Sequence, residues 1–181
     1  MKTLAALALL LAGHARSDAP ARPNPPTFLP FGFMTHNVPV PSLMQGQNAS
    51  AVVSTAAQAR RGFNIALPYL SSRAARPAAD RAAILAYLDR CVAVGIRVVY
   101  DLTRLTGYHM GELPPLSLLT EEVKAVGSHP AVVAWHLADE PDCNGMALER
   151  VAAAKAAVRA LSELPVAMCF CSAGPTGGTA W

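Results

Sequence analysis

Five short apolar segments recur along the chain at a nearly constant interval, and this spacing limits the possible folds more than any other feature. Successive segments start 32 to 35 residues apart, at residues 31, 63, 96, 131 and 165. About 30 residues accommodate one strand, one helix and two loops. The stretches between the segments have helical spacing of apolar residues, most clearly over 77–95. The pattern therefore predicts alternating strands and helices, with a parallel sheet buried on both faces.

Three architectures have to be compared with this pattern. Helical repeat arrays have similar periods, but these units share no signature and begin with a strand. An open doubly wound sheet that binds nucleotides needs a glycine-rich first turn, which residues 35–39 (THNVP) lack. A complete (β/α)8 barrel typically needs about 250 residues, whereas this chain has 181. We therefore predict an α/β fold, an incomplete (β/α)8 TIM barrel with about five βα units.

The first residues have the pattern of a targeting signal. Lys2 precedes the apolar run 4–12, which is too short to span a membrane, and Gly13 and Ala15 supply small residues for cleavage. We predict a signal peptide at 1–15, a Pro-rich lead-in at 16–30 and the barrel part at 31–181. The protein is then secreted, with no membrane association after cleavage; an uncleaved anchor is the alternative.

The net charge and the cysteines limit which ligands the chain is expected to bind, and they argue against nucleic acids and metal ions. A net charge of +3, with 15% charged residues, is too weak to indicate a nucleic-acid surface. Cys91 lies on an apolar helix stripe and is expected in the core, whereas Cys143 could pair with Cys169 or Cys171, and the sequence does not choose among the pairings. A Cys-x-Cys pair without a second Cys/His pair makes a poor zinc site. We expect no metal and no cofactor.

The chemistry concentrates at the end of the fourth strand, where Asp139 and Glu140 directly follow an apolar run and Pro141 ends it. The carboxyl ends of barrel strands open onto the active-site face. Strict alternation would put His136 and Glu140 on the inner face and Asp139 on the other, which argues against a metal site shared by His136 and Asp139. The structural alternative is a solvated turn, with Asp142 or Asn144 capping the next helix.

The stretch His129-Pro130-Ala131, followed by Trp135 and by Asp139-Glu140-Pro141, resembles the fourth-strand signature of clan A glycoside hydrolases. These enzymes are TIM barrels that cleave glycosidic bonds with retention. The resemblance extends over roughly 31–171 and implies that Glu140 is the general acid/base. It also implies a nucleophilic glutamate at the end of a seventh strand, which this chain lacks. Many relatives have Asn before the acid, where this chain has Asp139, an acceptor when ionised.

Retaining hydrolysis needs two carboxyl groups about 5–5.5 Å apart, one to protonate the leaving oxygen and one to attack. The acid must keep its proton near neutral pH, and the adjacent Asp139 could raise its pKa. Further residues expected to contact an oligo- or polysaccharide are His36, Asn37, Tyr69, Asp101 and Trp135, while Tyr108 and Trp181 could stack on a sugar. The sequence thus predicts a secreted retaining glycosidase with Glu140 and Asp139 as catalytic residues. The alternatives are a non-catalytic carbohydrate-binding pseudoenzyme or a truncated inactive fragment.

Overall fold

The computed structural model describes residues 32–35, 55–69, 78–107 and 113–170. The predicted signal peptide (1–15) and lead-in (16–30) lie outside these ranges. So do four of the predicted sugar-contacting residues, namely His36, Asn37, Tyr108 and Trp181.

Five parallel strands form one sheet in the order of the sequence. They are β1 (Gly32–Thr35), β2 (Ile65–Pro68), β3 (Arg97–Asp101), β4 (Val132–Asp139) and β5 (Val166–Cys169). Each βα unit therefore adds the next strand on the same side of the last one. A doubly wound sheet would instead reverse its strand order at a switch point. The sequential order is that of a (β/α)8 barrel, and the predicted incomplete α/β barrel is confirmed.

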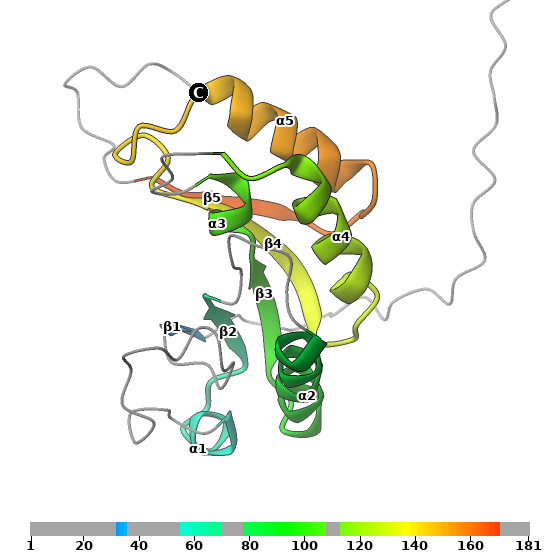
Figure 1. Cartoon of the computed structure of the whole chain (residues 1–181). Coiled ribbons are helices and arrows are strands. Elements are labelled where there is room, and N and C mark those ends of the chain that lie inside the picture. The colour runs from blue at the N-terminus through cyan, green and yellow to red at the C-terminus, as the bar shows by residue number, and fades with distance from the viewer. Residues whose placement is uncertain (1–31, 36–54, 70–77, 108–112, 171–181) are drawn as a thin grey trace, which may run out of the picture.

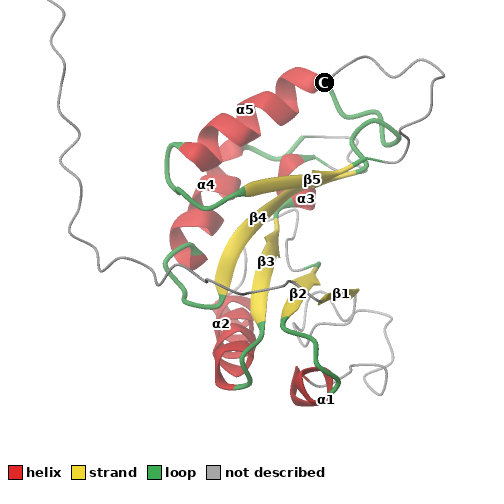
Figure 2. Ribbon diagram, turned by 180° about the vertical axis from the view of Figure 1, so that it is seen from behind, coloured by secondary structure: helices red, strands yellow, loops and turns green. Residues whose placement is uncertain are grey.

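The longer helices lie on one face of the curved sheet (Figures 1 and 2). The helices are α1 (Thr55–Arg60), α2 (Ala78–Ala93), α3 (Thr103–Thr106), α4 (Leu116–Val126) and α5 (Leu148–Arg159). In Figure 2 the strands face the viewer, and α2, α4 and α5 lie behind them. No described helix covers the other face. Among the described elements, helices therefore cover one face only, and the opposite face, which lines the interior of a barrel, still holds buried side chains such as His136 and Asp101.

The core fills the space between the sheet and this helix layer. Leu88 and Cys91 of α2 are fully buried, as is Trp135 of β4. The ring of Tyr100 on β3 meets Trp135 edge to face, with ring centroids 5.9 Å apart. The predicted core position of Cys91 on an apolar helix stripe is confirmed, because Cys91 belongs to this buried cluster together with Ile84 and Leu88. The helix layer is thus fixed by apolar packing against buried residues of β3 and β4.

The short helix α3 was not predicted from the sequence. It follows β3 directly, and the backbone N–H of Thr103 donates to the Asp101 carboxylate over 3.1 Å. Such a contact, from an Asp to the backbone two residues on, closes a turn locally. Four residues carry too little periodicity to be recognised in a sequence. The turn matters for the site, because it orients Asp101.

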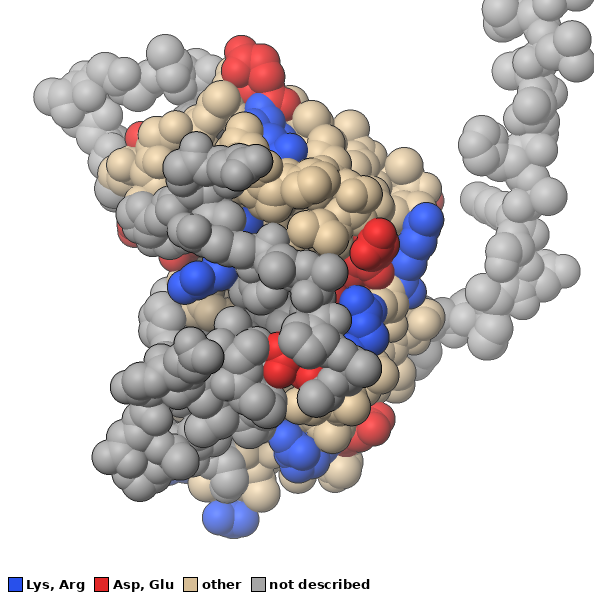
Figure 3. Space-filling view, viewed as in Figure 1, with Lys and Arg blue, Asp and Glu red and all other residues tan. Residues whose placement is uncertain are grey.

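The surface of the described part carries charges of both signs. On the helix side, basic and acidic side chains are interspersed rather than gathered into one field (Figure 3). Within the described ranges, no helix is both long enough and apolar enough to cross a membrane.

Candidate active site

A β-bulge in β4 determines which side chains reach the uncovered face of the sheet. In the β4–β5 register His136 pairs with Ala167, whereas Ala138 pairs with Met168 and Asp139 with Cys169. Leu137 is therefore an extra residue on β4, and the alternation of side chains shifts by one position after it. The prediction that His136 and Asp139 lie on opposite faces is wrong, because it assumed a strand without a bulge.

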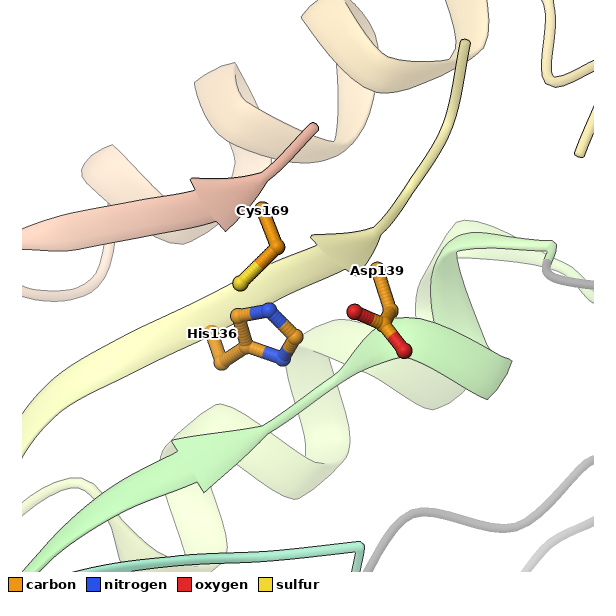
Figure 4. A group of neighbouring side chains, drawn as sticks. All are labelled: His136, Asp139 and Cys169. Atoms are coloured by element: carbon orange, nitrogen blue, oxygen red, sulfur yellow. The ribbon is translucent and has the colours of Figure 1, made fainter. Parts of the chain in front are cut away.

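Three chemically different side chains converge as a result. His136 and Asp139 come from β4 and Cys169 comes from the end of β5 (Figure 4). One nitrogen of His136, one carboxylate oxygen of Asp139 and the sulfur of Cys169 all lie within 4.8 Å of one another. The His136 side chain is buried, Asp139 is partly exposed and Cys169 is exposed. The group therefore has a buried base and a solvent-facing rim at the carboxyl ends of the two strands.

Asp101 holds the imidazole of His136 from the neighbouring strand. The Asp101 carboxylate lies 3.1 Å from His136 Nδ1, and both side chains are 1% exposed. The Thr103 hydroxyl also donates to Asp101. Asp101 was predicted to contact a sugar at the mouth, but it is fully buried beneath His136. Its observed contacts position the histidine instead.

Tyr69 and Asp139 are two predicted residues that the fold brings together. The hydroxyl of Tyr69, just after β2, donates to Asp139 Oδ2 over 2.6 Å. Burial, followed by the bond to the Asp139 carboxylate, raises the pKa of Tyr69 above its usual range. The tyrosine therefore stays protonated and remains a donor, which leaves the other Asp139 oxygen as an acceptor.

Glu140 leaves the strand with an unusual backbone. It is exposed and has a φ of +47°, a left-handed conformation that is uncommon for residues other than glycine. Its N–H donates to the Cys169 carbonyl over 3.0 Å, which carries the strand pairing one residue further. Because of the bulge, Asp139 is the residue that lies beside His136, and Glu140 follows it at the solvent-facing edge of the site.

The turn after Glu140 is closed by a side chain. The Asn144 amide donates to the Glu140 carbonyl over 2.9 Å and to the Asp139 carbonyl over 3.3 Å. Helix α5 begins after Ala147, where no side chain caps it. The expectation that Asp142 or Asn144 caps this helix is therefore wrong, because Asn144 bonds to the preceding turn instead.

Trp135 is not at the mouth. Its side chain is fully buried in the helix layer, and its indole N–H donates to Ser162 Oγ over 2.9 Å. The structure therefore corrects its assignment as a sugar-contacting residue: it contributes to the core.

In the sequence, the cysteines gave little indication of a functional site. Cys91 and Cys169 are free thiols, whereas Cys143 is disulfide-bonded. Burial, and then the Asp139 and Glu140 carboxylates, raise the pKa of Cys169. Sequence reasoning argued against a site role for His136, because it placed Asp139 on the other face, and it did not consider Cys169 as a site residue. The signal that could have found them is their position at the carboxyl ends of consecutive strands.

Comparisons with known proteins agree with this architecture. No protein-family model and no curated protein matches the chain significantly. Two solved structures of the Pseudomonas stutzeri endoglucanase Cel5A do match in fold. The first, a complex with cellobiose, has a TM-score of 0.53 at 17% identity and covers 74% of this chain and 47% of that one. The second has a TM-score of 0.52 at 14% identity, with 76% and 49% covered.

The chain thus spans about half the length of these endoglucanase structures. Identities this low support a shared fold and leave the chemistry to be argued from the residues. The chain therefore has an incomplete α/β-barrel fold that is similar to part of these structures.

Proposed function

We propose that this chain is the N-terminal part of a secreted glycoside hydrolase that cleaves O-glycosidic bonds with retention, and that Glu140 is its general acid/base. The observation that carries the proposal is the position of Glu140. It lies exposed directly after the carboxyl end of β4, in a sheet wound like a TIM barrel. Barrel enzymes place their catalytic groups at this edge. The resemblance of residues 129–141 to the clan A signature points to the same glutamate.

Neighbouring residues support a sugar-binding role for this edge. Tyr69, just after β2, and Asp139, at the end of β4, form a hydrogen-bonded pair, and both carry polar groups of the kind that bind sugar hydroxyls. The Cel5A complex holds cellobiose in a similar fold, which supports an oligo- or polysaccharide as the ligand class.

The reaction needs a second carboxylate. A retaining enzyme holds its nucleophile about 5–5.5 Å from the acid/base. In the proposed complete barrel this group follows the seventh strand, beyond β5. Glu140 would protonate the leaving glycosidic oxygen and later take a proton from the attacking water.

The test is the hydrolysis of glycosides by the full-length protein and by its Glu140→Gln variant. Loss of a positioned general acid should lower kcat/KM by about 10²–10⁴-fold on unactivated oligosaccharides. The loss should be much smaller on aryl glycosides with acidic leaving groups, which depart without protonation. Glu121→Gln is the matched control, since Glu121 is an exposed residue of α4.

Two results would contradict the proposal. Unchanged activity of Glu140→Gln on unactivated substrates would remove Glu140 from the mechanism. If NMR shows that the first-formed product has the opposite anomeric configuration to the substrate, the double-displacement route is excluded. Sugar binding by both proteins without any turnover would favour the non-catalytic carbohydrate-binding alternative.

A further inference from the structure

We propose that His136, Asp139 and Cys169 bind one divalent transition-metal ion at the carboxyl ends of β4 and β5, and that Zn²⁺ suits this ligand set best. The three side chains offer a ring nitrogen, a carboxylate oxygen and a sulfur. These are the ligand types that zinc takes in tetrahedral sites, where three protein groups leave the fourth position for water.

The described geometry is close to that of a three-ligand site. The candidate atoms lie within 4.8 Å of one another. Bonds of about 2.0–2.3 Å to zinc bring ligand atoms to roughly 3–4 Å from each other. Cys169 is exposed and Asp139 is partly exposed. A small rotation of these two side chains towards His136 would therefore complete the site without movement of the core.

The hydrogen bond between His136 and Asp101 leaves the other ring nitrogen of His136 as the atom that can bind a metal. Asp101 accepts a hydrogen bond from the backbone of Thr103, and its contact with Nδ1 of His136 puts the proton on that nitrogen. The lone pair of the neutral ring then resides on Nε2. A carboxylate behind a metal-binding histidine is the common arrangement around zinc, where it fixes the tautomer and the ring orientation.

Nε2 of His136 provides the independent evidence for a ligand. This atom is buried and has no hydrogen-bond partner within the described residues. In Figure 4 the ring edge that carries it faces Cys169, away from the nitrogen held by Asp101. Buried polar atoms are rarely left unpaired. A metal ion between His136, Cys169 and Asp139 would satisfy it.

Asp139 and Cys169 complete the charge balance. The Tyr69 hydroxyl fixes Asp139 through Oδ2, so that the other oxygen can ligate. Cys169 binds as the thiolate and releases its proton to solvent. One thiolate, one carboxylate and one neutral imidazole then neutralise a divalent ion. The sulfur and nitrogen ligands favour Zn²⁺ or Co²⁺ over Mg²⁺ and Ca²⁺.

The test uses the metal-free, full-length protein titrated with Co²⁺ and then with Zn²⁺. We expect one equivalent of Co²⁺ to produce tetrahedral visible bands and a sulfur-to-cobalt charge-transfer band in the near ultraviolet, and Zn²⁺ to displace it. Cys169→Ser should abolish the charge-transfer band and weaken Zn²⁺ binding at least tenfold in calorimetry. Cys91→Ala is the matched control, because Cys91 is the other free thiol among the described residues and lies in the core.

A second variant separates ligation from folding. Asp139→Asn keeps the side-chain shape and should also weaken Zn²⁺ binding at least tenfold, while the near-ultraviolet circular dichroism of the apo protein stays unchanged. Absence of stoichiometric binding, or a charge-transfer band that survives Cys169→Ser, would overturn the proposal. None of these readouts depends on sugar hydrolysis, so the metal site and the proposed function can fail separately.

Discussion

Glu122 is a buried carboxylate in the helix layer, and its partners come from two other elements. The Tyr100 hydroxyl of β3 donates to Glu122 Oε1, and the Arg81 guanidinium of α2 lies 3.7 Å from Oε2. Glu122 itself is 3% exposed. A buried carboxylate stays charged at low cost only while such partners remain. This single residue of α4 therefore connects that helix to β3 and to α2.

Removing the Tyr100 hydroxyl should destabilise the protein. Tyr100→Phe deprives the buried Glu122 of one donor, and we expect the free energy of unfolding to fall by about 1–3 kcal/mol. Urea denaturation with an unchanged m value measures the effect. Tyr87→Phe is the matched control, because the Tyr87 hydroxyl lies beside the Cys91 thiol and has no nitrogen or oxygen partner within the described residues. Equal losses in both variants would contradict this account.

At the scale of the elements, Arg150 joins α5 to the segment between β3 and α4. Its Nε donates to the Thr106 carbonyl over 2.8 Å, and Nη2 donates to the Leu105 and Pro114 carbonyls. Desolvation lowers the pKa of the guanidinium. Two carbonyls at the end of the short helix α3 and one just before α4 thus share one planar donor group. This contact keeps α3, and with it the turn that orients Asp101, against the rest of the barrel part.

Arg150→Lys should loosen this segment. An ammonium cannot serve three carbonyls in the fork geometry of the guanidinium. We expect a loss of about 1–2 kcal/mol in unfolding free energy, together with faster hydrogen exchange at 103–107. Arg159→Lys is the control, since Arg159 makes one long bond of 3.4 Å to a carbonyl. Exchange at 103–107 that is the same in both variants would contradict the assigned role of Arg150.

The spacing of apolar segments was enough to predict the order of the elements and the barrel-like winding. Local pattern could not predict the bulge at Leu137, because residues 132–138 (VVAWHLA) are mostly apolar on both faces and the register depends on the partner strand. The prediction therefore placed Asp139 on the wrong face. The sequence also located Tyr69 and Asp101 at strand ends. Their hydrogen-bond partners, Asp139 and His136, belong to another strand and could not be predicted from spacing.

At the scale of the molecule, the described sheet is covered by helices on one face, and β1 and β5 are its edges. Ala167 and Cys169 of β5 are exposed on the other face, and Phe170 follows, 45% exposed. An edge strand with unpaired backbone groups is a template for pairing with a second chain. In a closed barrel both features would be covered by further strands.

The 181-residue chain should therefore associate as its concentration rises, which sedimentation equilibrium would detect. Ala167→Lys puts a charge on the uncovered face of the edge strand and should shift the equilibrium at least tenfold towards monomer, because pairing would bury that charge. Ala153→Lys adds the same charge on an exposed position of α5 and should leave the equilibrium unchanged. Equal effects of the two variants would indicate general charge repulsion instead of edge pairing.

The left-handed backbone at Glu140 raises the conformational free energy of any residue that carries a side chain there. A residue other than glycine or asparagine in that conformation loses about 1–2 kcal/mol. Replacing Glu140 with glycine would recover part of that energy, so a library of variants screened only for thermal resistance would tend to lose this glutamate. Selection for heat resistance would thus favour glycine at residue 140, whereas selection for sugar cleavage would favour glutamate. A difference between the two selected populations at this position would show that the carboxyl group is kept for activity and not for stability.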